Sequence, residues 1–231
     1  MPEGDGGEAP ANEPKFPILV LTVSGGHNEL ILMKRHFDFN VIGETRDDAA
    51  GEAFDKVARL LKLPYPGGPS VMRAAKNGDG GKFKFPRTML EVGSFDFSFS
   101  GIKTAVLYFI EKEKRAGRRI TKKFISNVAA SFQEAIIDVL VAKVIAAVEK
   151  YCPAETHLAG GVSANTALRE RIAAEIAKLN KRRGAKIIFR CPQKFEYCTD
   201  NAAMIASAGY YKYKKSPKKI SINYVEARAS F

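Results

Sequence analysis

The sequence is poor in cysteine and histidine and contains no tryptophan. Its 231 residues include three cysteines and three histidines. Cys152, Cys191 and Cys198 form no CxxC pair, and no HxxxH or HExxH pair occurs, so the sequence predicts neither a disulfide framework nor a zinc knuckle nor a complete metal site. Unpaired cysteines are typical of a reducing compartment, and we expect a cytoplasmic protein.

Long apolar runs are also missing. No segment reaches the roughly 18 consecutive apolar residues that mark a membrane helix. The opening stretch MPEGDGGEAPANEP has neither the basic nor the apolar region of a secretion signal. We therefore expect no secretion and no membrane partner. Residues 1–16 are acidic and rich in glycine and proline, which predicts a flexible linker or loop.

Positive charge is in excess and clustered. Lys and Arg number 37 against 25 Asp and Glu, for a formal net charge of +12. Residues 112–123, 178–194 and 212–219 hold 7, 7 and 5 basic residues and a single acidic one, Glu113. Clustered cations release counterions from phosphates on contact, which favours a nucleic-acid partner. The alternative is that these blocks are solvated loops and helix ends.

The apolar pattern predicts alternating strands and helices, and therefore an α/β protein. Residues 17–23 and 29–34 read as a β-hairpin with glycines at positive φ in its tip. A helix is predicted over 47–63, then a turn at 65–69 and a polar helix at about 70–76. The remaining predictions are an extended segment at 95–100 that buries three phenylalanines, helices at 122–151, 166–179 and 201–211, and strands at 156–159 and 185–190.

Two glycine pairs are candidate anion sites. At the hairpin tip, successive N–H groups and the Ser24 hydroxyl offer donors to a phosphate, although Gly25-Gly26 also suits an ordinary tight turn. Gly160-Gly161 leaves a strand and opens a helix, where backbone amides and the helix dipole attract anions. Ordinary capping of that helix by a Ser or Asn side chain is the alternative.

Four carboxylates have two interpretations each. Asp48, Glu52 and Asp55 share one face of the helix predicted over 47–63. That face is either simply solvated, or one carboxylate accepts hydrogen bonds from a ribose diol. Asp200, with Thr199, is predicted to cap the helix that follows, and metal binding is the alternative.

Five segments occur in the order and approximate spacing of one family. They are VSGGHNELIL, GETRDDAAGEAFDKVARLLKLPYPGGP, FDFSFSGIKTA, AGGVSANTALR and CTDNAAMIASAG. From about Pro17 to Tyr211 the chain resembles the bacterial tRNA N6-adenosine threonylcarbamoyltransferases, the TsaD-type proteins formerly called O-sialoglycoprotein endopeptidases. The resemblance implies an actin-like ATPase fold of the hexokinase and heat-shock superfamily, mostly its second domain, over residues 17–211. Residues 212–231 would be a basic tail.

The resemblance also implies a reaction and a site. The family transfers a threonylcarbamoyl group from threonylcarbamoyl-AMP to N6 of the adenosine 3′ of the anticodon in ANN-decoding tRNAs, and a TsaB-type paralogue and a TsaE-type ATPase are expected partners. Asp200 would bind a divalent metal ion, iron or zinc. No catalytic residue is assigned. The implied substrate-binding residues are Val23, Ser24, Gly25, Gly26, Asp55, Gly68 and Asn165.

The chain departs from the family in two ways. In the family a preceding domain carries an HxxxH pair that supplies two more metal ligands, and this sequence has no such pair. We therefore expect a fragment, a mis-started gene product or half of a split protein, and the alternative function is a non-catalytic module that binds tRNA or a paralogue. A metallopeptidase is the least favoured function, since HExxH is absent. Met72 stands where some members carry an acidic substrate contact.

Overall fold

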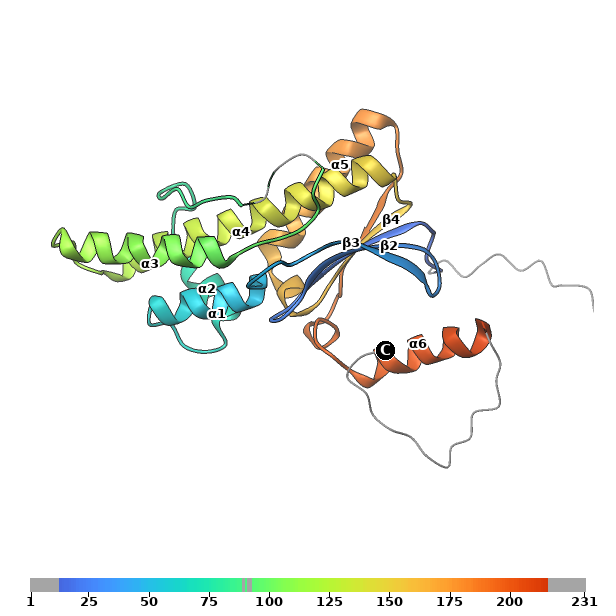
Figure 1. The fold of residues 1–231 in the computed structure, drawn as a ribbon, viewed down its shortest axis with the longest axis horizontal. Helices are drawn as coiled ribbons and strands as arrows, with labels where there is room; N and C mark the ends of the chain where they lie inside the picture. Colours follow the sequence, from blue (N-terminus) through green and yellow to red (C-terminus); the bar gives the residue numbers. More distant parts are fainter. Residues whose placement is uncertain (1–12, 89, 91–92, 216–231) are drawn as a thin grey trace, which may run out of the picture. The chain divides into compact units, whose positions relative to one another are not determined.

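The computed structural model describes residues 13–88, 90 and 93–215 (Figure 1). These residues form two compact units, one ending at Thr199 and the other beginning at Asp200. Most of the expected linker, 1–16, and most of the expected tail, 212–231, lie outside the described residues. Within the described ranges, no helix has the length and apolar character needed to cross a membrane.

A five-stranded mixed sheet organises the first unit, with strand order β3-β2-β1-β4-β5. β1 (Ile18–Val23) pairs antiparallel with β2 (Asn28–Arg35), which confirms the hairpin. β2 pairs antiparallel with β3 (Asp38–Glu44), a strand that the sequence pattern did not predict. β1 also pairs parallel with β4 (Glu155–Ala159), and β4 pairs parallel with β5 (Ile188–Arg190). Helices together with this sheet confirm the α/β class.

The long helix α4 (Lys122–Tyr151) was predicted with the correct bounds. Thr121 caps its first turn by accepting a hydrogen bond from the Phe124 N–H at 3.1 Å, and Cys152 ends it in the left-handed conformation. The helix packs against α2 (Gly67–Ala75) and α5 (Thr166–Arg183). Its buried residues include Phe124, Val128, Phe132, Ile136, Val139, Lys143 and Ala147.

Two short helices follow β3, and both begin elsewhere than predicted. α1 (Ala50–Leu60) starts late because the Asn28 side chain accepts from the Ala50 N–H at 3.2 Å. α2 (Gly67–Ala75) starts inside the predicted turn, since proline is tolerated in the first turn of a helix. Ser70 and Val71 of α2 are buried, so this helix is not the polar one expected.

The segment before α3 (Ser100–Arg115) is extended as predicted, and Phe95, Phe97 and Phe99 are buried. Its polar side chains hold Asp47: the hydroxyls of Ser98 and Ser100 donate to that carboxylate at 2.5 and 2.6 Å. Desolvation alone would raise the pKa of Asp47, but hydrogen bonds from Ser100, Ser98 and the Phe99 N–H hold this pKa below its ordinary value. The anchored carboxylate also fixes the start of α3, a helix that the sequence analysis missed.

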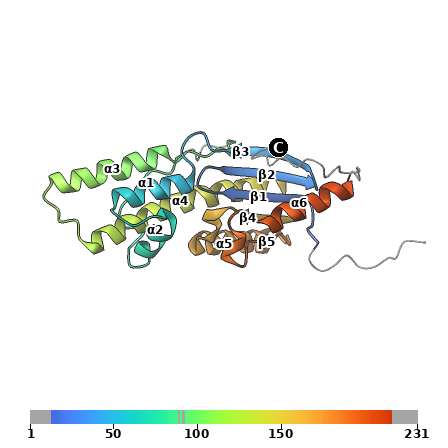
Figure 2. The same ribbon diagram turned by 90° about the horizontal axis from the view of Figure 1, so that it is seen from below.

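The last elements differ from prediction mainly at their ends. α5 (Thr166–Arg183) extends beyond the predicted end at 179, and β5 is shorter than the predicted strand. α6 (Ala202–Lys215) belongs to the second unit and takes up the first residues of the expected tail. Figure 2 shows the strands of the first unit's sheet side by side, in the order β3, β2, β1, β4.

Candidate functional site

The hairpin tip packs between the start of α1 and the loop after β4. The Gly51 N–H donates to the Ser24 carbonyl at 3.1 Å, and a Cβ on Gly51 would lie 2.5 Å from that oxygen. Gly160 adopts φ +87°, and a Cβ there would lie 2.3 Å from the Val23 carbonyl oxygen. Only glycine permits these two approaches. Val23 is thereby buried beneath the tip.

Ser24 determines the shape of the tip. Its hydroxyl oxygen accepts from the N–H groups of Gly26 at 3.3 Å and His27 at 3.0 Å, and its own N–H donates to the His27 carbonyl at 2.8 Å. The prediction that Gly25 and Gly26 need positive φ was wrong, because this serine-centred turn bends the chain without it. Among the described residues, the Gly25 N–H is the tip amide that has no acceptor.

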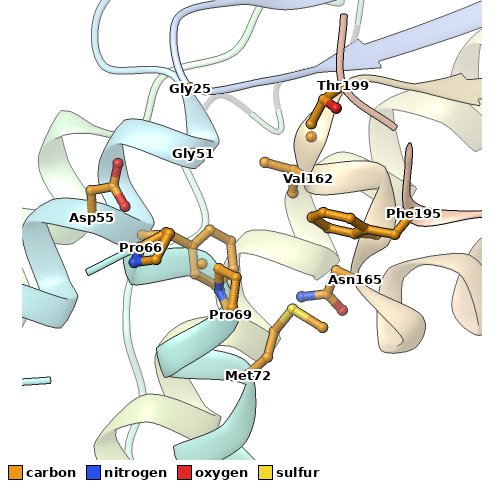
Figure 3. A pocket seen from close by; sticks show the side chains of 14 residues that line it. Gly25, Gly51, Asp55, Pro66, Pro69, Met72, Val162, Asn165, Phe195 and Thr199 are labelled. Atoms are coloured by element: carbon orange, nitrogen blue, oxygen red, sulfur yellow. The ribbon is translucent and has the colours of Figure 1, made fainter. Parts of the chain in front are cut away.

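A pocket of about 280 Å³ lies beside this packing (Figure 3). It brings together four of the eight residues expected to form a site: Gly25, Asp55, Gly68 and Asn165. The segments that line it are the hairpin tip, α1, the start of α2, the loop before α5, and two residues near the end of the first unit. The other lining residues are Gly51, Phe54, Pro66, Pro69, Met72, Gly161, Val162, Ala164, Phe195 and Thr199.

Three lining glycines leave the pocket wall bare. Gly25, Gly68 and Gly161 have no positive φ, and a Cβ on any of them would meet nothing within 4 Å. Neither backbone conformation nor packing therefore requires glycine at these positions. The effect of glycine here is to leave space and to expose the peptide backbone to a ligand.

The N-terminus of α2 lines the pocket, and its own N-cap residue, Pro66, provides no side-chain cap. Its first residue, Gly67, donates its N–H to Asp55 Oδ1 at 2.7 Å. The second residue, Gly68, has no intrahelical acceptor at that position, and Pro69 has no N–H to donate. The helix dipole adds partial positive charge at this end, which the Asp55 carboxylate balances in part, while the Gly68 N–H stays available to an anion.

Of the three carboxylates near α1, only Asp55 lines the pocket. Asp48 precedes the helix, so the three do not share a helical face as predicted. Lys56 Nζ lies 2.7 Å from Asp48 and 2.8 Å from Glu52, and hydrogen bonds from these carboxylates raise the pKa of Lys56. Asp48 and Glu52 thus share one lysine, while Asp55 supports the start of α2.

Asn165 forms part of the wall but its side chain is already engaged. Its Oδ1 caps α5 by accepting from the Leu168 N–H at 3.2 Å, and its Nδ2 donates to Gln133 Oε1 at 3.1 Å. The residue is buried. The capping interpretation of this loop is therefore confirmed, and Asn165 shapes the pocket from within the wall.

Apolar side chains line the two opposite walls. Figure 3 shows Pro69 and Met72 of α2 on one side, and Val162 with the Phe195 ring on the other. A slot of this kind accepts a flat ring, and the neighbouring amides accept an anion. Sequence analysis missed Phe195, because a single aromatic residue in a short 3₁₀ helix carries no motif or periodicity that marks a site.

Asp200 is the first residue of the second unit and does not cap α6. The cap is Asn201, whose Oδ1 accepts from the Met204 N–H at 3.1 Å, so the predicted cap was one residue early. Across the described ranges, no three His, Cys, Asp or Glu side chains are grouped as a metal site requires. The residues present thus do not fit a complete site for iron or zinc.

These features define an α/β protein with a pocket lined by glycine backbone, a helix N-terminus and apolar side chains. The chain belongs to the TsaD family, the tRNA N6-adenosine threonylcarbamoyltransferases, whose sequence pattern matches residues 6–207. Two relatives that carry this name come from Desulfitobacterium hafniense, 51% identical over 199 residues, and Kosmotoga olearia, 53% identical over 201 residues. They match 86% and 87% of this chain, which spans only 55% and 56% of their length.

Two solved structures resemble the fold at low identity. One is the activator of the 2-hydroxyisocaproyl-CoA dehydratase from Clostridium difficile with bound ADPNP, with a TM-score of 0.45, 15% identity, and coverage of 89% of this chain and 65% of the other. The other is HypF of T. kodakarensis, with a TM-score of 0.45, 16% identity, and coverage of 78% and 22%.

Proposed function

We propose that the chain is the substrate-binding part of a tRNA N6-adenosine threonylcarbamoyltransferase. The whole protein would transfer the threonylcarbamoyl group from threonylcarbamoyl-AMP to N6 of the adenosine 3′ of the anticodon in ANN-decoding tRNAs. One observation carries the proposal: in a member of this family, a single pocket combines a helix N-terminus with a free Gly68 amide, bare glycine backbone and an apolar slot.

The pocket chemistry suits an adenylate donor. In the transfer, the N6 amine attacks the carbamoyl carbon and gives up one proton to water, the bond from that carbon to the phosphate oxygen breaks, and AMP leaves with the negative charge. Amides at Gly25 and Gly68 would hold the phosphate as this charge develops, and the slot between Met72 and Phe195 would hold the adenine. Asp55 keeps a second carboxylate oxygen for the ribose hydroxyls.

Several finer features belong to the same proposal. The sheet order, three antiparallel strands followed by two parallel ones, supports the actin-like architecture. Ser24 and Gly26 would position the Gly25 amide, and Val23 would support them. A cytoplasmic location, a TsaB-type paralogue and a TsaE-type ATPase are proposed as the setting of the whole protein.

We propose that this chain supplies only one ligand of a metal site and that the remainder of the whole protein supplies the others. Asp200 would be the one carboxylate that this chain contributes to a divalent iron or zinc ion, since a catalytic metal site takes about three protein ligands and the described residues group no such set. The same observation favours the second candidate function, a non-catalytic module that binds tRNA or a paralogue.

The pocket assignment is tested by filling the bare wall at Gly68. Gly68→Leu adds a side chain where a Cβ meets nothing, and leucine is a better helix former than glycine, so the fold should keep its stability. We expect calorimetry with AMP to show weak but saturable binding by the wild type, because about 280 Å³ is slightly below the usual size of ligand sites, and no measurable binding by the variant.

Gly101→Leu is the matched control. Gly101 is the second residue of α3, as Gly68 is of α2, and its Cβ would make one ordinary contact, 3.6 Å from a Thr88 methyl carbon, away from the pocket. AMP affinity should be unchanged there. Equal AMP affinity of Gly68→Leu and the wild type would refute the pocket assignment. A mass-spectrometric assay of modified tRNA, run with the remainder of a relative supplied, separates transferase from non-catalytic module.

A further inference from the structure

The connection between α3 and α4 displays one of the three basic blocks. All seven basic residues between 112 and 123 are exposed. Arg118 pairs with Glu113, and Lys123 Nζ donates to the Asn77 carbonyl at 2.8 Å. The other five form no ion pair with any residue that the structure describes, and they are Lys112, Lys114, Arg115, Arg119 and Lys122.

Backbone hydrogen bonds hold this connection in one shape. The Arg118 N–H donates to the Glu113 carbonyl and the Gly117 N–H to the Lys114 carbonyl, each at 3.0 Å, with Gly117 at φ +76°. These are the two bonds of a Schellman motif at the end of α3. Thr121 then caps α4. The cations are therefore displayed on a preorganised turn, which lowers the entropy lost when they bind a partner.

An exposed aromatic side chain lies on the same helix face. Tyr108 is 66% exposed, and it precedes Lys112 by four residues and Arg115 by seven, so the three form one stripe along α3. Surfaces that bind unpaired nucleic acid combine cations for the backbone with aromatic rings for the bases. An acidic protein partner would need the cations but not a bare ring among them.

The stripe is remote from the pocket. Ser100, the first residue of α3, is bonded to Asp47 beside α1, and the 16 residues of α3 carry the chain about 24 Å from there. Figures 1 and 2 both place the connection between α3 and α4 at one end of the first unit. A small ligand in the pocket does not reach this connection, whereas a folded RNA spans that distance.

We propose that Tyr108 and the five unpaired cations form a second RNA contact, in which the cations bind backbone phosphates and the ring stacks on an unpaired base. The inference rests on the proposed tRNA substrate. It assigns to the α3–α4 connection the task of holding the tRNA body while the target adenosine occupies the region of the pocket.

The experiment measures binding of an ANN-decoding tRNA transcript by fluorescence anisotropy across a salt series. In the variant Lys112→Ala/Arg115→Ala/Arg119→Ala, the slope of log affinity against log salt should fall by about 2 to 3, and affinity at low salt by on the order of 10-fold. The control Lys34→Ala/Arg59→Ala/Lys84→Ala removes the same charge from exposed positions elsewhere and should change the slope by less than about 1. Thermal melting checks that both variants fold.

Tyr108→Ala separates stacking from charge. It should weaken tRNA binding by roughly 5- to 100-fold with the salt slope unchanged. If the wild type and the variant Lys112→Ala/Arg115→Ala/Arg119→Ala bind tRNA equally well, this inference fails while the proposed tRNA substrate stands. The connection then serves another partner, such as an acidic protein. If the wild type binds no tRNA at any salt concentration, the proposed substrate fails as well. Unchanged affinity in Tyr108→Ala overturns the stacking contact.

Discussion

Glu155 is a fully buried carboxylate that joins segments far apart in the sequence. Arg190 of β5 contacts it with Nε at 2.7 Å and a terminal nitrogen at 3.2 Å, and His157 Nε2 lies 2.7 Å away. The Lys15 N–H, 140 residues earlier in the chain, donates to it at 2.9 Å. Desolvation alone would raise the pKa of Glu155, but these hydrogen bonds lower it from 4.5 to about 2.

Glu155 should therefore make stability depend on acid pH. A lowered carboxyl pKa stabilises the fold above pH 4.5, and that stabilisation is lost as pH falls toward 2. The shift corresponds to roughly 3 kcal/mol. Urea unfolding should show Glu155→Gln less stable than the wild type by about 1–3 kcal/mol at pH 7, with the gap closing between pH 4.5 and 2.

Glu175→Gln provides the comparison. Glu175 pairs with Lys178 at the surface of α5, where ion pairs contribute about 0–1 kcal/mol. Its loss should change stability little at either pH. A destabilisation of Glu155→Gln that stays constant from pH 7 to pH 2 would contradict the role given to the ionised carboxylate.

At the residue scale, the sequence indicated which segments form caps and the candidate site, but not always which side chain caps a helix or which partner a carboxylate contacts. Asp200 and Asn201 are adjacent and both are favoured caps, so propensity cannot choose between them. Asp55 was grouped with Asp48 and Glu52 because their spacing in the sequence places them on one face of the predicted helix. The position of Lys56 between Asp48 and Glu52 depends on where α1 begins, and Asn28, far away in sequence, determines that start.

At the element scale, the loop after β4 depends on one glycine. Gly160→Ala should be strongly destabilising, because the added Cβ meets the Val23 carbonyl and the residue is held at positive φ. Gly184, the C-terminal residue that ends α5, also has positive φ, at +63°, but a Cβ there meets nothing within 4 Å. Gly184→Ala thus isolates the backbone strain, about 1 kcal/mol.

Urea unfolding of both glycine variants measures the difference. We expect Gly160→Ala to lose at least about 2 kcal/mol more than Gly184→Ala, since backbone atoms cannot move aside as a flexible side chain would. Similar losses in the two variants would show that the end of β1, at Val23, can shift to make room for the added Cβ. Such tolerance would also weaken the case for a rigid pocket wall.

Helices and strands were predicted where a broad apolar face is buried, and were missed where only a narrow stripe is buried. α4 is apolar on much of its surface and was located with the correct ends. α3 buries only Ile102, Val106 and Ile110, so its stripe is thin and its end merges into the basic block. β3 is an edge strand with Phe39 and Val41 exposed, so its alternation does not separate a core face from a solvent face.

At the scale of the whole molecule, the chain spans little more than half the length of its relatives. Metal binding tests the proposal that Asp200 belongs to a site completed by the remainder of such a relative. The isolated chain should contain no stoichiometric metal, because one carboxylate is too few ligands. Supplying the remainder of a relative should restore metal and transfer activity. Asp200→Ala should then abolish metal retention, measured by elemental analysis beside the tRNA assay.

Asp200→Asn refines that test. Asn201 already caps α6, so this substitution removes the charge without removing the cap. The variant should lose its metal while thermal stability is unchanged. Metal content and activity equal to the wild type would show that Asp200 is not a ligand.

The parallel pairing of β1 with β4 makes the pocket a late product of synthesis on the ribosome. Gly25 and the Ser24 turn emerge early with the hairpin, but the opposite wall, from Gly161 to Asn165, arrives only after the whole of α4. Parallel strands need such a crossover, and contacts this distant in sequence form slowly. A nascent chain released before β4 would carry the glycine tip and no pocket. Ligand binding therefore reports that β4 has paired with β1.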